Sequence, residues 1–171
     1  ATVLRVQGLS LPRADQFGVD LIDLQFEVKA GEVVGIAGVS GNGQKELLYA
    51  LSGEDQRAGP ASIQVAGQNA GRMGPGQRRA LGLHFVPEER LGRGAVPTMG
   101  LAHNLLLTRT NAVSGSGWIQ VGALQKHAQS IIERFHVKAG GPNSAAKSLS
   151  GGNLQKFIVG REIDANPTLL I

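Results

Sequence analysis

The sequence has no cysteine and no long apolar run, and each absence excludes a class of protein. Without cysteine the chain can form no disulfide, no thiolate nucleophile and no metal site that cysteine builds. The longest apolar runs, 33–39 and 105–107, are far shorter than the roughly 20 residues that a helix needs to cross a bilayer. No basic segment followed by an apolar stretch opens the chain. We therefore expect neither a membrane-spanning helix nor an export signal, which is compatible with the cytosol.

Positive charge is in modest excess and is not gathered in one place. The 17 Lys and Arg residues against 13 Asp and Glu give a net charge of +4, but they are scattered along the chain. Nucleic acid is therefore not an expected partner. Glycine stands out instead, with 25 residues in 171, about twice its usual share of roughly 7%. The glycines cluster where the backbone must approach something closely.

The first half of the chain has the patterns of strands around one helix. Residues 3–7 and 21–28 alternate between apolar and polar side chains, which predicts two half-buried strands of an antiparallel layer. After Glu32, residues 33–37 are apolar and in part β-branched, so 32–37 has the pattern of a strand buried on both faces in a parallel sheet. The other elements predicted here are a helix over 44–51 that ends at Gly53, and strands over 62–66 and 83–86.

From Glu88 onward the composition is helical. Helices are predicted over 101–107 and 121–135, separated by the Ser- and Gly-rich stretch 112–117. A last helix is predicted over 152–163, where Gly160 should cost about 1 kcal/mol relative to alanine. Its expected buried face consists of Leu154, Phe157, Ile158 and Ile163. The predicted organisation is therefore a core over 1–87, a helical subdomain over 88–164 and the start of a strand over 165–171.

Residues 38–46 follow the predicted buried strand and open the helix, which is the context of a phosphate-binding loop. Backbone N–H groups and the helix N-terminus would face an anion there. The full motif G-x-x-x-x-G-K-[ST] has a lysine and a hydroxyl where this chain has Gln44 and Lys45. Lys45 cannot replace the lysine, because one residue along a helix turns a side chain by about 100°. A tight turn that binds nothing remains an alternative; a dinucleotide loop is not supported, since the glycines do not form G-x-G-x-x-G.

A second motif, LSGGNLQK, spans residues 149–156 just before the last predicted helix. Ser150 is a good N-cap, so a plain helix cap is the simplest alternative. The whole octapeptide, however, resembles the signature of ATP-binding cassette (ABC) proteins, in the form found in sugar and nucleoside importers. The resemblance implies that the signature contacts the γ-phosphate of ATP held by the other cassette of a head-to-tail dimer. The residues that it assigns to this role are Leu149, Ser150, Gly151, Gly152, Asn153 and Gln155.

The resemblance to ABC cassettes extends over the whole chain, through GEVVGIAGVSGNGQ, FVPEER, LSGGNLQK and PTLLI. It implies an α/β P-loop NTPase fold, with an antiparallel β layer, a parallel-sheet core and an inserted helical subdomain. The loop without its lysine resembles the second of two cassettes fused in one polypeptide. The nucleotide-binding residues that the resemblance implies are Phe17, as an aromatic that stacks on adenine, and Gly38, Ser40, Gly41, Asn42, Gly43, Gln44, Lys45 and Glu46. Core packing of Phe17 remains an alternative.

In FVPEER, Glu88 takes the place where other cassettes have a glutamine that touches the metal and relays motion to the membrane domain. The resemblance therefore assigns Glu88 and Glu89 to a coupling loop, with Glu88 as a metal contact, while an acidic helix N-terminus is the alternative. The family's Walker B acid, catalytic glutamate and switch histidine would follow Ile171. We thus expect a truncated cassette with no catalytic base and no hydrolysis by itself. The four histidines show no metal-ligand spacing.

Taken together, the resemblance implies an ATP-binding subunit that uses ATP and Mg²⁺ to drive import of a simple sugar or nucleoside. Its expected partners are a second cassette with an intact phosphate loop, a transmembrane permease and, indirectly, an extracytoplasmic solute-binding protein. The expected location is the cytoplasmic face of the membrane. An ABC ATPase of DNA repair or translation is one alternative, although it would need long insertions. A small P-loop kinase is another, and LSGGNLQK argues against it.

Overall fold

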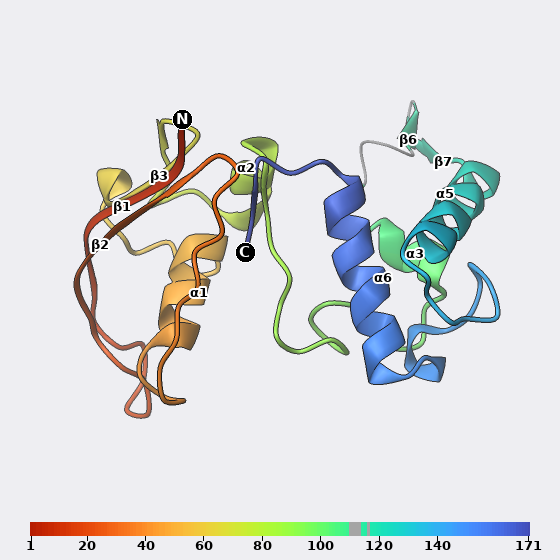
Figure 1. Ribbon diagram of the computed structural model, residues 1–171, viewed down its shortest axis with the longest axis horizontal. Coiled ribbons are helices and arrows are strands. Elements are labelled where there is room, and N and C mark those ends of the chain that lie inside the picture. Colours follow the sequence, from red (N-terminus) through yellow and green to blue (C-terminus); the bar gives the residue numbers. More distant parts are fainter. Residues whose placement is uncertain (110–113, 116) are drawn as a thin grey trace. The chain divides into compact units, whose positions relative to one another are not determined.

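The computed structural model describes residues 1–109, 114–115 and 117–171, and it divides into two units (Figure 1). The first consists of Ala1–Phe85 with Pro167–Ile171, and the second of Val86–Asn166. Half of the predicted Ser- and Gly-rich stretch 112–117 lies outside the described residues. Its described part contributes β6 (Ser114–Gly115), which pairs antiparallel with β7 (Trp118–Ile119). Across the described ranges, every helix is too short or too polar to span a bilayer.

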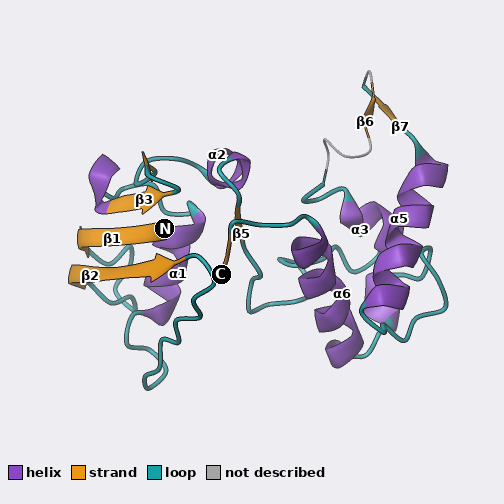
Figure 2. Cartoon of the chain, turned by 45° about the horizontal axis from the view of Figure 1, so that its top comes forward, coloured by secondary structure: helices purple, strands orange, loops and turns teal. Residues whose placement is uncertain are grey.

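An antiparallel sheet with the strand order β2-β1-β3-β4 forms one layer of the first unit (Figure 2). Its strands are β1 (Thr2–Leu11), β2 (Leu21–Lys29), β3 (Ile63–Val65) and β4 (Gln68–Asn69). In β1 the buried positions change from Leu4 and Val6 to Leu9 and Leu11, because the register shifts at Gly8, which has φ 60. The antiparallel layer predicted from the alternation is confirmed.

Helix α1 (Gln44–Ser52) packs against this sheet through Leu47, Ala50 and Leu51, which belong to the same buried cluster as the strands. Gly53 follows it with φ 88, so the predicted left-handed end of this helix is confirmed. The remaining elements of the unit are η1 (Pro60–Ser62), α2 (Pro75–Ala80), β5 (Leu83–His84) and β8 (Leu169–Leu170). Strands β5 and β8 pair in parallel, with Leu83 opposite Leu169.

The predicted buried strand over 32–37 is wrong for this structure. These residues are irregular, and Val33, Val34 and Ile36 are 97%, 42% and 56% exposed. An apolar segment is stable as a central strand only when neighbouring strands take up its N–H and C=O groups. No strand among the described residues pairs with segment 32–37. Its apolar side chains line an open hollow beside β8 instead.

The second unit is a cluster of helices around its own core. It contains α3 (Leu101–Leu105), α5 (Val121–Arg134), η2 (Ala146–Ser148) and α6 (Gly151–Asp164). Leu154, Phe157 and Ile158 of α6 are buried as predicted, but Ile163 is 39% exposed, so that prediction is wrong. Each residue turns a helix by about 100°, which carries position 163 away from the face of Ile158. Arg161 and Glu162 are buried there instead and form an ion pair with Nε and Oε1 3.1 Å apart.

Gly160→Ala is expected to destabilise the second unit, although alanine is the better helix former. A Cβ on Gly160 would lie 2.6 Å from Cδ2 of Phe135 and 3.2 Å from Cγ2 of Ile131. The strain should exceed the gain in helix propensity of about 1 kcal/mol and leave a net loss of about 1–2 kcal/mol. Denaturant unfolding measures the change. Gly122→Ala in α5 is the matched control, because its Cβ would meet nothing within 4 Å; equal stability gains in both variants would contradict the close packing.

Candidate functional site

The predicted phosphate loop, residues 38–43, leads directly into α1. Gly41 and Gly43 have φ 90 and 98, in the left-handed region that side chains other than glycine rarely adopt. Gly43 is the N-cap of α1 and has no side chain that could accept a hydrogen bond. The first N–H groups of the helix therefore face the loop without a side-chain acceptor from the cap. The backbone therefore has the form of an anion-binding turn at a helix N-terminus.

The first three side chains of α1 all have partners within the chain. The Gln44 amide accepts a hydrogen bond from the Asn42 N–H at 3.1 Å and donates one to the Val39 carbonyl, also at 3.1 Å. Lys45 turns away from the loop, and its Nζ lies 5.6 Å from the centre of the Tyr49 ring. Glu46 accepts a hydrogen bond from the Val19 N–H at 3.2 Å. The first turn of the helix thus presents no lysine to the loop.

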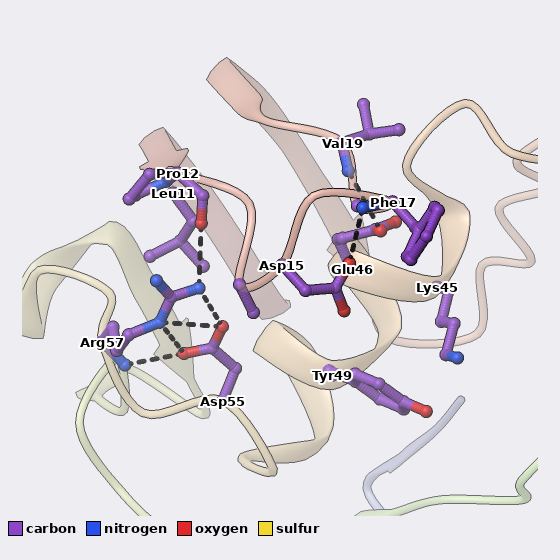
Figure 3. Close-up of a pocket in the computed structure, with 12 residues that line it drawn as sticks. Leu11, Pro12, Asp15, Phe17, Val19, Lys45, Glu46, Tyr49, Asp55 and Arg57 are labelled. Carbon is purple, nitrogen blue, oxygen red and sulfur yellow. Dashed lines mark hydrogen bonds and ion pairs between the residues drawn. The ribbon is translucent and has the colours of Figure 1, made fainter.

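A hollow of about 210 Å³ lies beside α1, between that helix and the segment that follows β1 (Figure 3). Phe17, Lys45 and Tyr49 are among the residues that line it. Phe17 is 87% exposed, so the alternative that it packs in the core is wrong. Its backbone N–H donates to Asp15, which holds the segment in a turn. An exposed aromatic ring can stack on a base, but none of residues 38–43 lines this hollow, so the adenine-stacking role of Phe17 remains a prediction.

The signature segment forms the N-terminus of α6 in the second unit. Ser150 is the N-cap, as predicted, and its Oγ accepts hydrogen bonds from the Asn153 backbone N–H at 3.4 Å and from Asn153 Nδ2 at 2.9 Å. Asn153 is itself fixed, because its Oδ1 accepts from the Lys138 N–H at 2.8 Å. Since the Ser150 hydroxyl accepts both bonds, its own hydrogen remains available to an outside acceptor. Gly151 and Gly152 are exposed beside it, whereas Leu149 and Gln155 are half-buried.

Sequence reasoning did not single out Arg90, which lies against this helix start. A Cβ on Gly151 would be only 3.4 Å from Nη2 of Arg90. A cation beside a helix N-terminus is unfavourable by itself but favourable for an anion that arrives there. The position follows from the fold of residues 89–95, where Ala95 N–H donates to the Arg90 carbonyl and Gly94 N–H donates to that of Glu89. No pattern in the sequence indicates this contact.

Glu88 and Glu89 are exposed and lie in an irregular segment, so the alternative that they begin a helix is wrong. The next helix, α3, starts only at Leu101. Among the described residues, no three His, Asp or Glu side chains gather as a metal site requires. Their assignment to a coupling loop, and that of Glu88 to a metal, remain predictions.

The comparisons with known proteins agree with one another. The family profile described as "ABC transporter" matches residues 21–171. The guanosine import ATP-binding protein NupO of Bacillus subtilis is 37% identical over 174 residues, covering 100% of this chain and 34% of that protein. The ribose import ATP-binding protein RbsA of Halalkalibacterium halodurans is 34% identical over 161 residues, covering 94% and 31%. The chain thus spans about a third of the length of these relatives.

Solved structures show the same fold. An ATP-binding cassette of an ABC transporter superposes with a TM-score of 0.76 at 19% identity, over 99% of this chain and 68% of that one. A dimeric bacterial ABC transporter cassette gives 0.77 at 17% identity, over 98% and 72%. The mixed α/β architecture is therefore that of an ABC cassette. The match of the profile to most of the sequence shows that this chain belongs to the ABC transporter family of ATP-binding cassettes.

Proposed function

We propose that this chain belongs to the ATP-binding subunit of an importer of simple sugars or nucleosides. In that subunit it supplies its signature segment to ATP held by a partner cassette. The observation that carries the proposal is the start of α6, where Ser150, Gly151 and Gly152 are exposed and the Ser150 hydroxyl is oriented by Asn153. The relatives named as guanosine and ribose import ATP-binding proteins support the solute class.

The chemistry of the signature segment is that of a preorganised anion site. The Ser150 hydroxyl and the first N–H groups of α6 would donate to the oxygens of the transferring phosphoryl group, where charge is spread in the transition state. Arg90 adds positive charge at the same helix end. Because these donors are fixed before the phosphate arrives, little reorganisation is needed when the two cassettes close.

The phosphate loop of this chain fits Mg²⁺ poorly. The motif requires a hydroxyl ligand for the ion at the position where this chain has Lys45, and an ammonium group cannot bind a second cation. We therefore assign Mg²⁺, together with the ATP that is hydrolysed, to the lysine-bearing loop of the partner. This chain would be the second, degenerate cassette of such a pair.

The proposed assembly contains a transmembrane permease, contacted through the coupling loop at Glu88 and Glu89, and a solute-binding protein outside the membrane. The chain would then lie at the cytoplasmic face. The two relatives are named as import ATP-binding proteins, and this supports the arrangement.

Deleting the gene that encodes this chain is expected to abolish uptake of one simple sugar or nucleoside in its host. Uptake of amino acids and peptides should be unchanged, because other importers carry those solutes. Radiolabelled uptake across a panel of pentoses, hexoses and nucleosides is the measurement, with complementation by the intact gene as the control. Unchanged uptake of the whole panel, combined with sensitivity to DNA damage or a translation defect, would instead support the ABC ATPases that act without a permease.

A further inference from the structure

We propose that the phosphate loop of this chain is closed by its own side chains, which keeps nucleotide phosphate out of it. The inference rests on the proposed function in one respect, the assignment of residues 38–46 as a nucleotide-binding loop. It goes further because it names the residues that oppose binding. Gln44 and Glu46, in the first turn of α1, carry it.

Gln44 occupies the inside of the loop. In a working phosphate loop the backbone N–H groups point inward and bind phosphate oxygens. Here the N–H of Asn42 donates to Gln44 Oε1 at 3.1 Å, so one of these donors is already used. The other end of the amide donates to the Val39 carbonyl across the loop at 3.1 Å. A Cβ on Gly38 would lie 2.7 Å from Gln44 Nε2, which places the amide directly over the first glycine of the loop.

Glu46 puts a fixed carboxylate into the same turn. A negative charge in the first turn of a helix interacts favourably with the helix dipole, as a bound phosphate would. The carboxylate accepts a hydrogen bond from Val19 N–H at 3.2 Å in a partly buried setting, so its position is held (Figure 3). The carboxylate lies against Val19 and Gly18, on the side of the hollow, and its charge lowers the positive potential that the helix N-terminus offers to phosphate. The same bond ties the segment bearing Phe17 to α1.

Lys45 adds no positive charge at the loop. Its Nζ lies over the Tyr49 ring, on the side of the hollow beside α1, one helical turn further along. Restoring the motif residues alone, by Gln44→Lys with Lys45→Ser, should therefore leave a poor site as long as Glu46 remains. The loop becomes a good site only when the carboxylate is removed as well.

Titration calorimetry of the chain with Mg·ATP tests the proposal. Wild type is expected to bind weakly, and Glu46→Gln should bind about tenfold more tightly, because it removes the charge and keeps the acceptor for Val19 N–H. Glu27→Gln is the matched control, since Glu27 lies on β2 and pairs with Arg5. The triple variant Gln44→Lys, Lys45→Ser, Glu46→Gln should bind at least about tenfold more tightly than the double variant that retains Glu46.

Amide hydrogen exchange provides a readout that needs no nucleotide. The Asn42 amide of the wild-type chain should be protected without ligand, and Gln44→Ala should expose it. The proposal is overturned by sub-micromolar binding of Mg·ATP to wild type, by equal affinities of Glu46→Gln and Glu27→Gln, or by an unprotected Asn42 amide in wild type. Each measurement uses this chain alone, so these results are independent of whether gene deletion affects solute uptake.

Discussion

Replacing Ser150 by arginine in the proposed importer is expected to lower ATP hydrolysis by about 10²- to 10³-fold, with transport lost in parallel. The hydroxyl accepts from Asn153 Nδ2 at 2.9 Å, so its own hydrogen can be donated outward to phosphate. A guanidinium group would fill the space that the γ-phosphate needs. Arg90 already lies beside Gly151, and repulsion between two cations would push the new side chain out into that space. Loss of the cap should cost only about 1 kcal/mol, so the fold should persist.

The measurement compares ATPase rates of reconstituted importers under identical conditions. Ser148→Arg is the matched control, because it adds the same cation two residues earlier, at an exposed serine whose hydroxyl donates to the Ala145 carbonyl within its own turn. Gln44→Ala should have little effect, because the loop that it opens lacks its principal cation. A transporter that Gln44→Ala silences and Ser150→Arg leaves active would refute the division between a working signature and a degenerate loop.

The parts of the fold that were predictable are those set by local pattern. Alternation fixed the antiparallel strands, and the serine before Gly151 marked the start of α6. The segment 32–37 has an equally clear pattern, yet it is exposed, because a buried strand requires neighbours that its own sequence cannot supply. The prediction that Ile163 is buried was wrong for a related reason. The buried face of α6 continues into the Arg161 and Glu162 ion pair rather than into an apolar residue.

The candidate site divides in the same way. The positions of the loop and of the signature follow from contiguous motifs, so the sequence was enough to locate both. The contacts of Gln44 with Val39 and of Glu46 with Val19 depend on how the loop and a distant segment fold back on α1. Arg90 lies beside Gly151 although the two are still further apart in the sequence. Such contacts have no signature in the sequence, and the proposal that the loop is closed to phosphate depends on them.

The far end of α1 depends on Arg78, a side chain that is fully buried although it is charged. Its guanidinium donates to the carbonyls of Ala50 and Leu51 in the last turn of α1, the second at 2.8 Å. It also donates to Met73 at 2.9 Å and to Gly71 at 3.2 Å. Burial lowers the pKa of Arg78 to about 10, which still leaves it charged at neutral pH. One side chain thus joins the end of the helix that carries the phosphate loop to the segment before α2.

Arg78→Met is therefore expected to destabilise the chain by about 3 kcal/mol or more, because it leaves buried carbonyl groups without donors. For a chain of this size that corresponds to a fall in Tm of roughly 6–12 °C. Arg72→Met is the matched control, since Arg72 is exposed and its replacement should change stability by less than about 0.5 kcal/mol. Arg78→Lys should be intermediate, because an ammonium group keeps the charge but cannot reach four carbonyls arranged around a planar fork. Equal melting temperatures for Arg78→Met and Arg72→Met would show that the carbonyl groups find other donors and that α1 does not depend on this residue.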